Sequence, residues 1–337
     1  MTFTKTTPSC VSRRAFLQLS VGATAAGCLA LPAWAASDAF PSKPIRLVVG
    51  YPPGQTVDSS ARAAAVALSK IFGQPVIVDN RAGANGILGA QEVKQAAPDG
   101  YTLLFGTSGQ LAINPGIYKK LSYDPLKNFE PIALNGVGRL YLAVPLTSPF
   151  NSLADLVRFA KANPGKLSYG SGGRGITANL AMEILKKEAG VDILHVPYKG
   201  SAAALTDLLG GRIDVMMDAG GLMLPQITGG KLKPLGVSSK SRYAELPKVP
   251  TIAEQGYPGF EVASWTAVMA PAHTPPEVIA KLNKAFVESQ KNPEVIRAAK
   301  ASSSELSGGT PEAFGRFLAS ETLKWGQAAK DAGVEME

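Results

Sequence analysis

The chain has 337 residues, of which 45% are hydrophobic and 18% charged, a composition typical of a globular protein and not of a disordered one. Its formal charge is +8, but the basic residues are spread along the sequence without a stripe of interleaved aromatics, which argues against nucleic acid as a partner. Beyond the first 35 residues no stretch is long and apolar enough to cross a membrane, so we expect no stable membrane insertion.

Residues 1–35 are predicted to be an export signal that is removed. Ser12-Arg13-Arg14-Ala15-Phe16-Leu17-Gln18 resembles a twin-arginine signal, and Ala33-Trp34-Ala35 fits a signal-peptidase site. The apolar run between them is too polar for a membrane anchor, and the alternative is a frayed helix with a chance arginine pair. Cys28 follows a poor lipoprotein box, so lipid anchoring is the less favoured alternative to soluble, periplasmic export.

Both cysteines of the chain, Cys10 and Cys28, lie inside this predicted signal. The exported protein would therefore contain no disulfide, no thiolate nucleophile and no cysteine-ligated metal. It would carry 31 basic and 26 acidic residues, a modest positive excess that suits small anions or simply a soluble surface.

The sequence after residue 40 begins with alternating strand and helix patterns. The β-branched run Ile45–Val49 precedes a helical pattern that we expect to start at Asp58, as N-cap, and to end at Gly73. Further strands and a helix are predicted at Val76–Val78, Ile87–Ala97 and Tyr101–Phe105. This βαβαβ order predicts a parallel sheet with right-handed crossovers. A less regular stretch follows, and then two short strands at Ile132–Ala133 and Leu140–Val144.

The alternation restarts with a helix over Leu153–Ala162, capped by Asn151 or Ser152. Predicted strands and helices then follow one another as far as residue 238: Leu167–Tyr169, Thr177–Ala189, Leu194–Val196, Ser201–Leu209, Ile213–Met217, Leu222–Thr228 and Leu235–Ser238. The tail is predicted helical over Glu277–Ser289 and Glu312–Ala329, each opened by a proline. The second unit is thus inserted into the first, giving lobe 1 at 36–138 and 246–337, lobe 2 at 139–245, and a cleft between them.

In parallel α/β sheets ligands bind outside the carboxyl ends of the strands, so the loops at those ends are the candidate site. The loop after the first strand contains Tyr51, Gly54, Gln55, Thr56 and Asp58. Gly54 allows close approach of the backbone, Thr56 supplies a hydroxyl, and the helix N-terminus supplies free N–H groups, which together suit a carboxylate. An ordinary turn with an N-cap is the alternative. Gly106, Thr107 and Ser108, after the third strand, add small hydroxyl donors.

The segment Gly170–Gly175 reads G-x-G-x-x-G between a strand and a helix, the pattern of a dinucleotide site. Such a site needs an acidic residue at the end of the next strand, where this chain has Tyr198 and Lys199 instead. We therefore interpret Ser171, Gly172, Arg174 and Thr177 as an anion-binding helix start and expect no cofactor.

Three further side chains follow strands of the second unit. Tyr198 is suited to flank an organic ligand and Lys199 to meet its charge, although a packed tyrosine and a solvated lysine are as well supported. Asp218 is suited to bind a ligand hydroxyl or ammonium group, or to cap the next helix.

The sequence contains no recognised catalytic or metal-binding motif, so we expect neither an enzyme nor a metal site. His195 lies in an apolar strand and His273 in a proline-rich loop. The alternatives are an exported nucleotide-cofactor-dependent oxidoreductase that uses Gly170–Gly175, and a binding protein used for sensing.

Several segments, in order along the chain, resemble the Bug family, the receptors of tripartite tricarboxylate transporters. They are Pro41-Ser42-Lys43-Pro44-Ile45-Arg46, Asp79-Asn80-Arg81-Ala82-Gly83-Ala84, Pro98-Asp99-Gly100-Tyr101-Thr102-Leu103-Leu104, Val196-Pro197-Tyr198-Lys199-Gly200-Ser201, Leu246-Pro247-Lys248-Val249-Pro250-Thr251, and Trp265 with Ala270-Pro271. The resemblance implies an α/β two-lobed periplasmic-binding-protein (Venus flytrap) fold, each lobe a mainly parallel sheet flanked by helices.

The resemblance also implies a function: capture of a small carboxylate in the cleft and delivery to membrane transporter subunits. The expected ligands are dicarboxylates, tricarboxylates, acidic amino acids or aromatic acids. The carboxylate grip would come from Gly54–Asp58, Gly106–Ser108 and Ser171–Thr177, with Tyr198 and Asp218 at the cleft border. The chain departs from the family pattern at Gln55, Arg174, Ile176, Asn179 and Ala219. Arg174 would either pair with a second carboxylate or point to solvent. Closure is expected about Arg139–Ala143 and Val237–Lys240.

Overall fold

The computed structural model describes residues 40–334 together with residues 1, 2 and 4. The arginine pair and the two cysteines of the predicted export signal lie outside the described residues. Within the described part, no helix is long and apolar enough to span a bilayer.

The first parallel strands of the chain form one half of the fold, here called lobe 1. Strand β1 (Ile45–Val49) lies between β2 (Val76–Asn80) and β3 (Thr102–Thr107), and all three are parallel. The apolar side chains of β1 and those of Leu103–Phe105 in β3 are buried beneath α2 (Thr56–Phe72) and α3 (Ile87–Lys94). The carboxyl ends of these strands therefore lie at one edge of the sheet, as the predicted βαβαβ pattern requires.

Two long antiparallel strands continue lobe 1. Strand β9 (Ala263–Pro271) is inserted between β3 and β4 (Phe129–Pro145), and β10 (Ser304–Gly308) pairs with the far edge of β4. The prediction of two short strands in this region was wrong, because β4 is one continuous strand. The glycines of β4 let a neighbouring strand lie close to it and do not end it. A Cβ on Gly136 would lie 2.9 Å from the carbonyl oxygen of Glu305 on β10.

Lobe 2 is built around the carboxyl-terminal half of β4. There β4 lies between β7 (Val215–Ala219) and β8 (Leu232–Val237), antiparallel to both. Strand β5 (Ser168–Ser171) joins β7 to β6 (Leu194–Pro197) in parallel. The helices of this lobe are α5 (Leu153–Ala162), α6 (Thr177–Ala189), α7 (Ser201–Leu209) and α8 (Gly220–Thr228).

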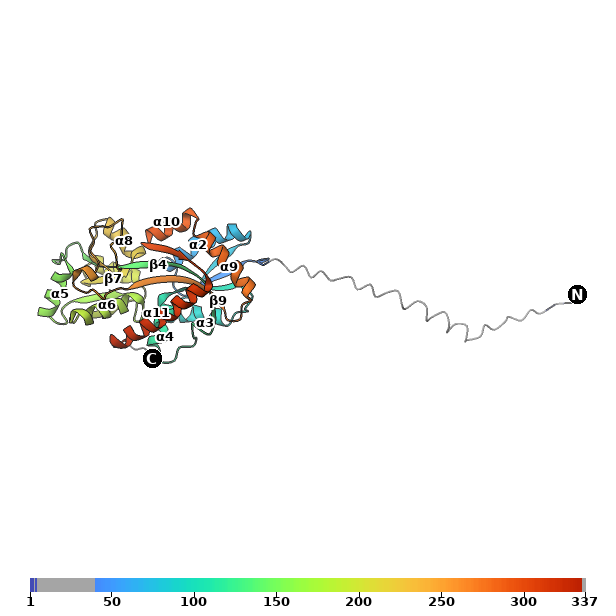
Figure 1. Cartoon of the computed structure of the whole chain (residues 1–337), viewed down its shortest axis with the longest axis horizontal. Helices are drawn as coiled ribbons and strands as arrows, with labels where there is room; N and C mark the ends of the chain where they lie inside the picture. Colours follow the sequence, from blue (N-terminus) through green and yellow to red (C-terminus); the bar gives the residue numbers. More distant parts are fainter. Residues whose placement is uncertain (3, 5–39, 335–337) are drawn as a thin grey trace. The chain divides into compact units, whose positions relative to one another are not determined.

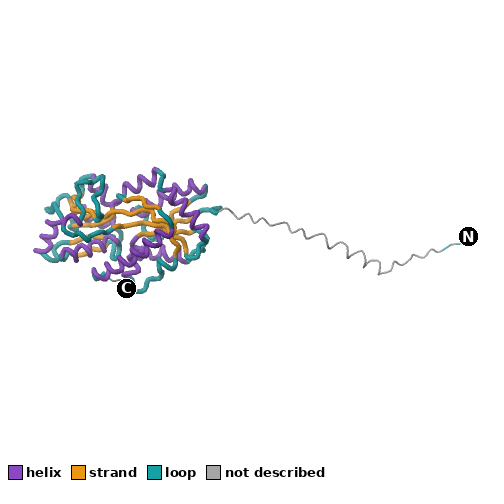
Figure 2. Tube along the Cα trace, viewed as in Figure 1, coloured by secondary structure: helices purple, strands orange, loops and turns teal. Residues whose placement is uncertain are grey.

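Strand β4 serves both lobes. Its residues as far as Arg139 pair with β9, and those from Leu140 pair with β7 and β8. Figure 1 shows β4 and β9 running through the middle of the fold, and Figure 2 shows the strands as a central layer with helices on both sides. The two-lobed α/β fold predicted from the sequence is confirmed.

The remaining helices complete lobe 1. They are the short turns η1 (Ala84–Gly86) and η2 (Gly109–Ile113), α4 (Asn114–Ile117), α9 (Pro276–Ser289), α10 (Pro293–Ala301) and α11 (Pro311–Asp331). The turn η3 (Ala253–Gln255) lies against β8 of lobe 2, where the side-chain nitrogen of Gln255 donates to the carbonyl oxygen of Leu235 at 2.9 Å. Thr310 caps α11 by accepting a hydrogen bond from the N–H of Ala313 at 3.2 Å, with a proline in the first helical position. In the second lobe, Ser152 and not Asn151 caps α5.

The centre of lobe 1 contains a buried polar contact. The carboxylate of Glu321 on α11 accepts hydrogen bonds from the indole nitrogens of Trp265 at 2.8 Å and Trp325 at 2.9 Å. Both tryptophans are fully buried, so the carboxylate satisfies two donors that would otherwise lack partners. This contact fixes α11 against β9.

Candidate functional site

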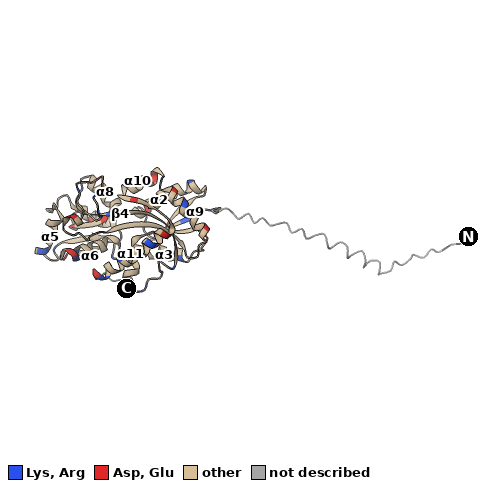
Figure 3. Cartoon of the chain, in the orientation of Figure 1, with Lys and Arg blue, Asp and Glu red and all other residues tan. Residues whose placement is uncertain are grey.

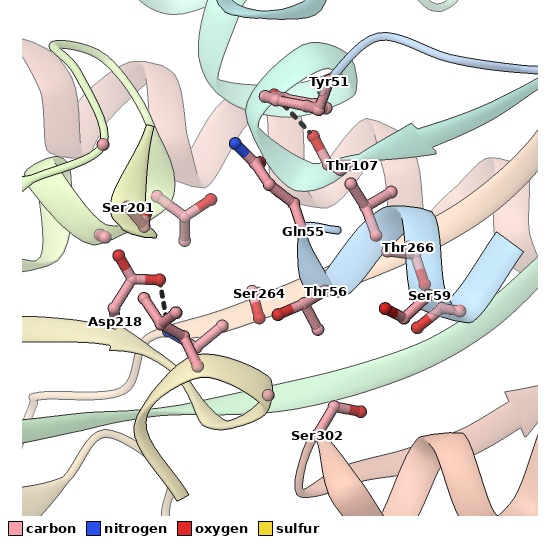
Figure 4. A pocket seen from close by; sticks show the side chains of 18 of the residues that line it. Tyr51, Gln55, Thr56, Ser59, Thr107, Ser201, Asp218, Ser264, Thr266 and Ser302 are labelled. Carbon is pink, nitrogen blue, oxygen red and sulfur yellow. Dashed lines mark hydrogen bonds between the residues drawn. The ribbon is translucent and has the colours of Figure 1, made fainter. Parts of the chain in front are cut away.

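A cavity of about 340 Å³ lies between the lobes, at the carboxyl ends of the parallel strands. Its polar lining residues are Tyr51, Gln55, Thr56, Ser59, Ser60, Thr107, Ser108, Thr177, Ser201, Asp218, Ser264, Thr266 and Ser302. Figure 4 shows Thr56, Ser59, Ser264 and Thr266 gathered on one side and Ser201 and Asp218 on the other, with Gln55 between them. Both lobes thus contribute to one cavity.

The loop after β1 supplies backbone and side chains of the first wall. Gly54 has a positive φ of 85°, a conformation suited to glycine, and Gly54, Gln55 and Thr56 all line the cavity. Helix α2 begins at Thr56, and Gln55 occupies its N-cap position without a side-chain cap. Thr56 and Val57, whose N–H groups have no partner within the helix, both line the cavity.

Asp58 is not the N-cap that the sequence predicted, because it lies within the first turn of α2. Its buried carboxylate accepts hydrogen bonds from the N–H of Gly54 at 2.9 Å, from Arg62 at 3.0 Å and from Asn80 at 2.9 Å. Burial alone would raise the pKa of Asp58, but these hydrogen bonds outweigh it and lower the pKa. Asp58 does not line the cavity; it fixes the shape of the loop.

The end of β3 contributes hydroxyl groups. The hydroxyl of Tyr51 lies 3.1 Å from that of Thr107, and burial raises the pKa of Tyr51 to about 12, so the phenol stays neutral. The hydroxyl of Ser108 lies 3.0 Å from that of Thr177, which belongs to the other lobe. All four line the cavity, whereas Gly106 does not. These hydroxyls are neutral groups that can donate to an anion.

The Gly170–Gly175 loop contributes Gly172 to the opposite wall, and the start of α6 contributes Thr177. Ser171 does not line the cavity: its hydroxyl donates to the carbonyl oxygen of Gly173 at 2.8 Å and lies 2.7 Å from Nε2 of His195. His195 stacks on Tyr169, and burial lowers its pKa to about 4. The imidazole is therefore neutral near pH 7 and supports the loop from behind.

The basic side chains predicted for the site lie elsewhere. Arg174 and Lys199 are exposed and absent from the cavity lining, so Arg174 points to solvent. Tyr198 is also outside the lining, with its hydroxyl donating to Asp207 at 2.8 Å. Among the described residues, no lysine, arginine or histidine lines the cavity. Figure 3 shows the basic and acidic residues dispersed over the described chain.

Asp218 is the acid of the cavity lining, at the carboxyl end of β7. Its Oδ1 accepts the N–H of Ala219 at 2.7 Å, while its Oδ2 is buried without a hydrogen-bond partner among the described residues. Burial raises the pKa of Asp218 to about 6, and the nearby Ser201 hydroxyl and the Ala219 N–H offset this only in part. This carboxylate places a hydrogen-bond acceptor in a wall otherwise rich in hydroxyl groups.

Several lining residues were not predicted. Ser264, Trp265 and Thr266 come from β9, and Ser302 from the end of α10, neither of which the sequence analysis identified as an element. Ser201 lay in a predicted helix, and its position after β6 was the available signal. Ser264 and Thr266 of β9 carry no motif, so only the antiparallel insertion of that strand brings them to the site.

The arrangement is suited to hold a small anion by neutral hydrogen-bond donors. The described part of the chain contains no group of three or more His, Cys, Asp or Glu side chains that could hold a metal ion. The G-x-G-x-x-G loop does precede a helix, but β6 ends at Pro197 and no acid follows it at the ribose position of a dinucleotide fold.

Comparison with known proteins gives a consistent picture. The sequence model described as "Tripartite tricarboxylate transporter family receptor" matches residues 60–334. A "UPF0065 protein in tcbD-tcbE intergenic region" from Pseudomonas sp. strain P51 is 41% identical over 86% of each chain. Protein BugT of Bordetella pertussis is 34% identical over 89% of this chain and 93% of its own length.

Two similar solved structures contain ligands named in their descriptions. Rpa4515 of R. palustris, described "with adipate", has a TM-score of 0.83 and 36% identity and covers 88% of this chain and 99% of its own. MatC of Rhodopseudomonas palustris, described "with bound malate", has a TM-score of 0.80 and 29% identity. The match covers 86% of this chain and 99% of MatC. Adipate and malate are dicarboxylates.

Proposed function

This chain belongs to the tripartite tricarboxylate transporter receptor family, and we propose that it captures a small carboxylate-bearing solute in the interlobe cavity and delivers it to a transporter of that type. The family is one of periplasmic solute-binding proteins, and we assign this member no catalytic activity. The proposed partners are the ligand and the membrane subunits of the transporter.

The observation that carries the proposal is the composition of the cavity wall. Hydroxyl groups from both lobes and the start of α2 line it, and none of the described lining residues is a lysine, arginine or histidine. Neutral donors held by the fold can bind a carboxylate through several charge-assisted hydrogen bonds. Because they belong to two lobes, the ligand would complete its set of bonds only when the lobes approach each other.

The ligand class follows from cavity size and family. A volume of about 340 Å³ is at the small end of ligand pockets, which favours a compact acid. Relatives described with adipate and malate support a dicarboxylate. Tricarboxylates, acidic amino acids and aromatic acids are the further candidates. Export by the twin-arginine route to the periplasm, with residues 1–35 removed, is the proposed localisation.

A thermal-shift screen of residues 36–337, refolded to remove any co-purified ligand, tests the proposal. The panel contains dicarboxylates, tricarboxylates, acidic amino acids, aromatic acids, NAD and NADP. A ligand present at 100 times its dissociation constant adds about 2.7 kcal/mol to the free energy of unfolding, which shifts the midpoint by several degrees. A shift with a carboxylate supports the proposal. A shift with a nucleotide alone would reject the proposal and support the oxidoreductase alternative.

A further inference from the structure

Asn85 connects the two lobes next to the ligand cavity. Its side-chain Nδ2 donates to the carbonyl oxygen of Gly175 at 3.1 Å and to Oδ1 of Asn114 at 2.8 Å. Asn85 and Asn114 belong to lobe 1, whereas Gly175 lies in the loop of lobe 2 that leads into α6. One side chain thus ties that loop to the opposite lobe.

Asn85 is held firmly on the lobe 1 side. The side chain of Asn114 is fully buried, and its Nδ2 donates back to the carbonyl oxygen of Asn85 at 3.2 Å and to the hydroxyl of Tyr123 at 3.1 Å. The Tyr123 hydroxyl in turn donates to the carbonyl oxygen of Gln110 at 2.7 Å. Because each link is satisfied, the direction of the Asn85 amide is fixed before it meets Gly175.

The backbone of Asn85 supports the same role. It has left-handed dihedral angles of φ 53° and ψ 39°, which asparagine tolerates better than most residues. A glycine would adopt this conformation without strain, so the conformation alone does not require the side chain. The hydrogen bonds of the side chain, and not the backbone conformation, therefore account for an asparagine at position 85.

Gly175 is held from both lobes. Its N–H donates to Oδ1 of Asn179 at 2.8 Å within lobe 2, while its carbonyl oxygen accepts from Asn85. A Cβ on Gly175 would lie 2.4 Å from Cδ1 of Ile117 in lobe 1, so the two lobes are also in close contact here. The next residues, Ile176 and Thr177, line the ligand cavity.

Asn85 itself does not line the cavity. We propose that Asn85 is a positioning residue that latches the lobes in the closed arrangement and so sets the residence time of the ligand. The role in ligand release rests on the proposed function, whereas the latch itself does not. A single hydrogen bond changes such an equilibrium by roughly 2- to 12-fold. The effect is expected in the dissociation rate, because the Asn85–Gly175 bond must break before the lobes can separate and release the ligand.

The test uses Asn85→Gly, which removes the amide and keeps the backbone conformation, and Asn85→Asp, which replaces the Nδ2 donor by an acceptor facing the Gly175 carbonyl. His273→Gly is the matched control, since His273 also has a positive φ (68°) and lies in the loop after β9. Residues 36–337 contain no cysteine, so dyes placed by Lys70→Cys and Lys161→Cys, both at exposed positions, report the interlobe distance by energy transfer.

In the absence of ligand, both Asn85 variants should shift the population toward a longer interlobe distance, and His273→Gly should not. With a carboxylate that binds the parent protein, both should release it roughly 2- to 12-fold faster. Unchanged interlobe distances in both Asn85 variants would overturn the latch, whether or not a carboxylate binds. A lowered unfolding midpoint with an unchanged distance would show a role in folding alone and would also overturn it. Failure of every carboxylate to bind the parent protein would reject the proposed function instead.

Discussion

Ser238 and Leu140 are joined by two hydrogen bonds where the chain passes between the lobes. The N–H of Leu140 donates to the hydroxyl of Ser238 at 3.0 Å, and the N–H of Ser238 donates to the carbonyl oxygen of Leu140 at 3.0 Å. The Ser238 hydroxyl also donates to the carbonyl oxygen of Val262 at 2.5 Å. One fully buried serine therefore holds β4, the end of β8 and the approach to β9 together.

Ser238→Ala should destabilise the protein by about 1–3 kcal/mol, because it leaves the N–H of Leu140 and the carbonyl oxygen of Val262 buried without a partner. Urea unfolding of residues 36–337 measures the change. Ser239→Ala is the matched control: its hydroxyl bonds to the carbonyl oxygen of Ser241 at a more exposed position, so a change within about 0.5 kcal/mol is expected. Equal effects of the two substitutions would contradict the role given to Ser238.

Thr177→Val removes a cavity hydroxyl while keeping the shape of the side chain. We expect roughly 2- to 12-fold weaker binding of the carboxylate, the effect of one lost hydrogen bond, as measured by calorimetry. Arg174→Ala, three residues earlier in the same loop, is the control. Because Arg174 is exposed and outside the lining, its removal should change affinity less than twofold. Loss of binding on removal of Arg174 would instead support a pairing of its guanidinium with the ligand.

Asp218→Asn should change the pH dependence of stability. The folded-state pKa of Asp218 is raised to about 6 from an ordinary value of 3.8, so its favourable contribution is complete below pH 3.8 and is lost as the pH rises through about 6. Asparagine does not ionise, so the variant does not lose stability in this pH range at position 218. Its free energy of unfolding relative to the parent should therefore increase between pH 4 and 7, by up to about 3 kcal/mol. Parallel curves for the two proteins would show that Asp218 titrates normally.

Gly172→Ala should disturb the binding loop. A Cβ on Gly172 would lie 2.6 Å from the hydroxyl and 2.7 Å from the backbone nitrogen of Ser201, so the loop after β5 and the start of α7 would have to separate. We expect a loss of about 1–3 kcal/mol in stability together with weaker ligand binding. Gly210→Ala is the control, because its nearest contact would be 3.4 Å and its φ is −81°. Normal ligand binding by the Gly172 variant would place the site away from this loop.

Local patterns predicted the parts of the fold in which consecutive elements pack together. The runs at Ile45–Val49 and Thr177–Ala189 carry their own periodicity and end signals, and the structure confirms these elements. Strand β9 was missed because it pairs with strands far away in sequence. Both of its faces are largely buried, so apolar and polar residues do not alternate along it as they do in a half-exposed strand. The serine and threonine that β9 brings to the cavity were missed with it.

The candidate site was predictable at strand ends but not in the direction of each side chain. Thr56, Ser108 and Asp218 line the cavity, as expected from their positions after strands. Arg174 and Lys199 occupy similar positions but extend into solvent, because a long charged side chain avoids the desolvation that a buried position would impose. Their exposure depends on packing between the lobes, which the order of residues alone does not reveal.

The central claim is that the interlobe cavity binds a carboxylate through neutral donors. Calorimetric titration of residues 36–337 with the carboxylates of the panel, repeated with Thr177→Val, tests it most directly. The account predicts saturable binding of one carboxylate per chain, weakened roughly 2- to 12-fold in the variant. Absence of binding by every carboxylate, or equal affinity in the variant, would contradict the claim.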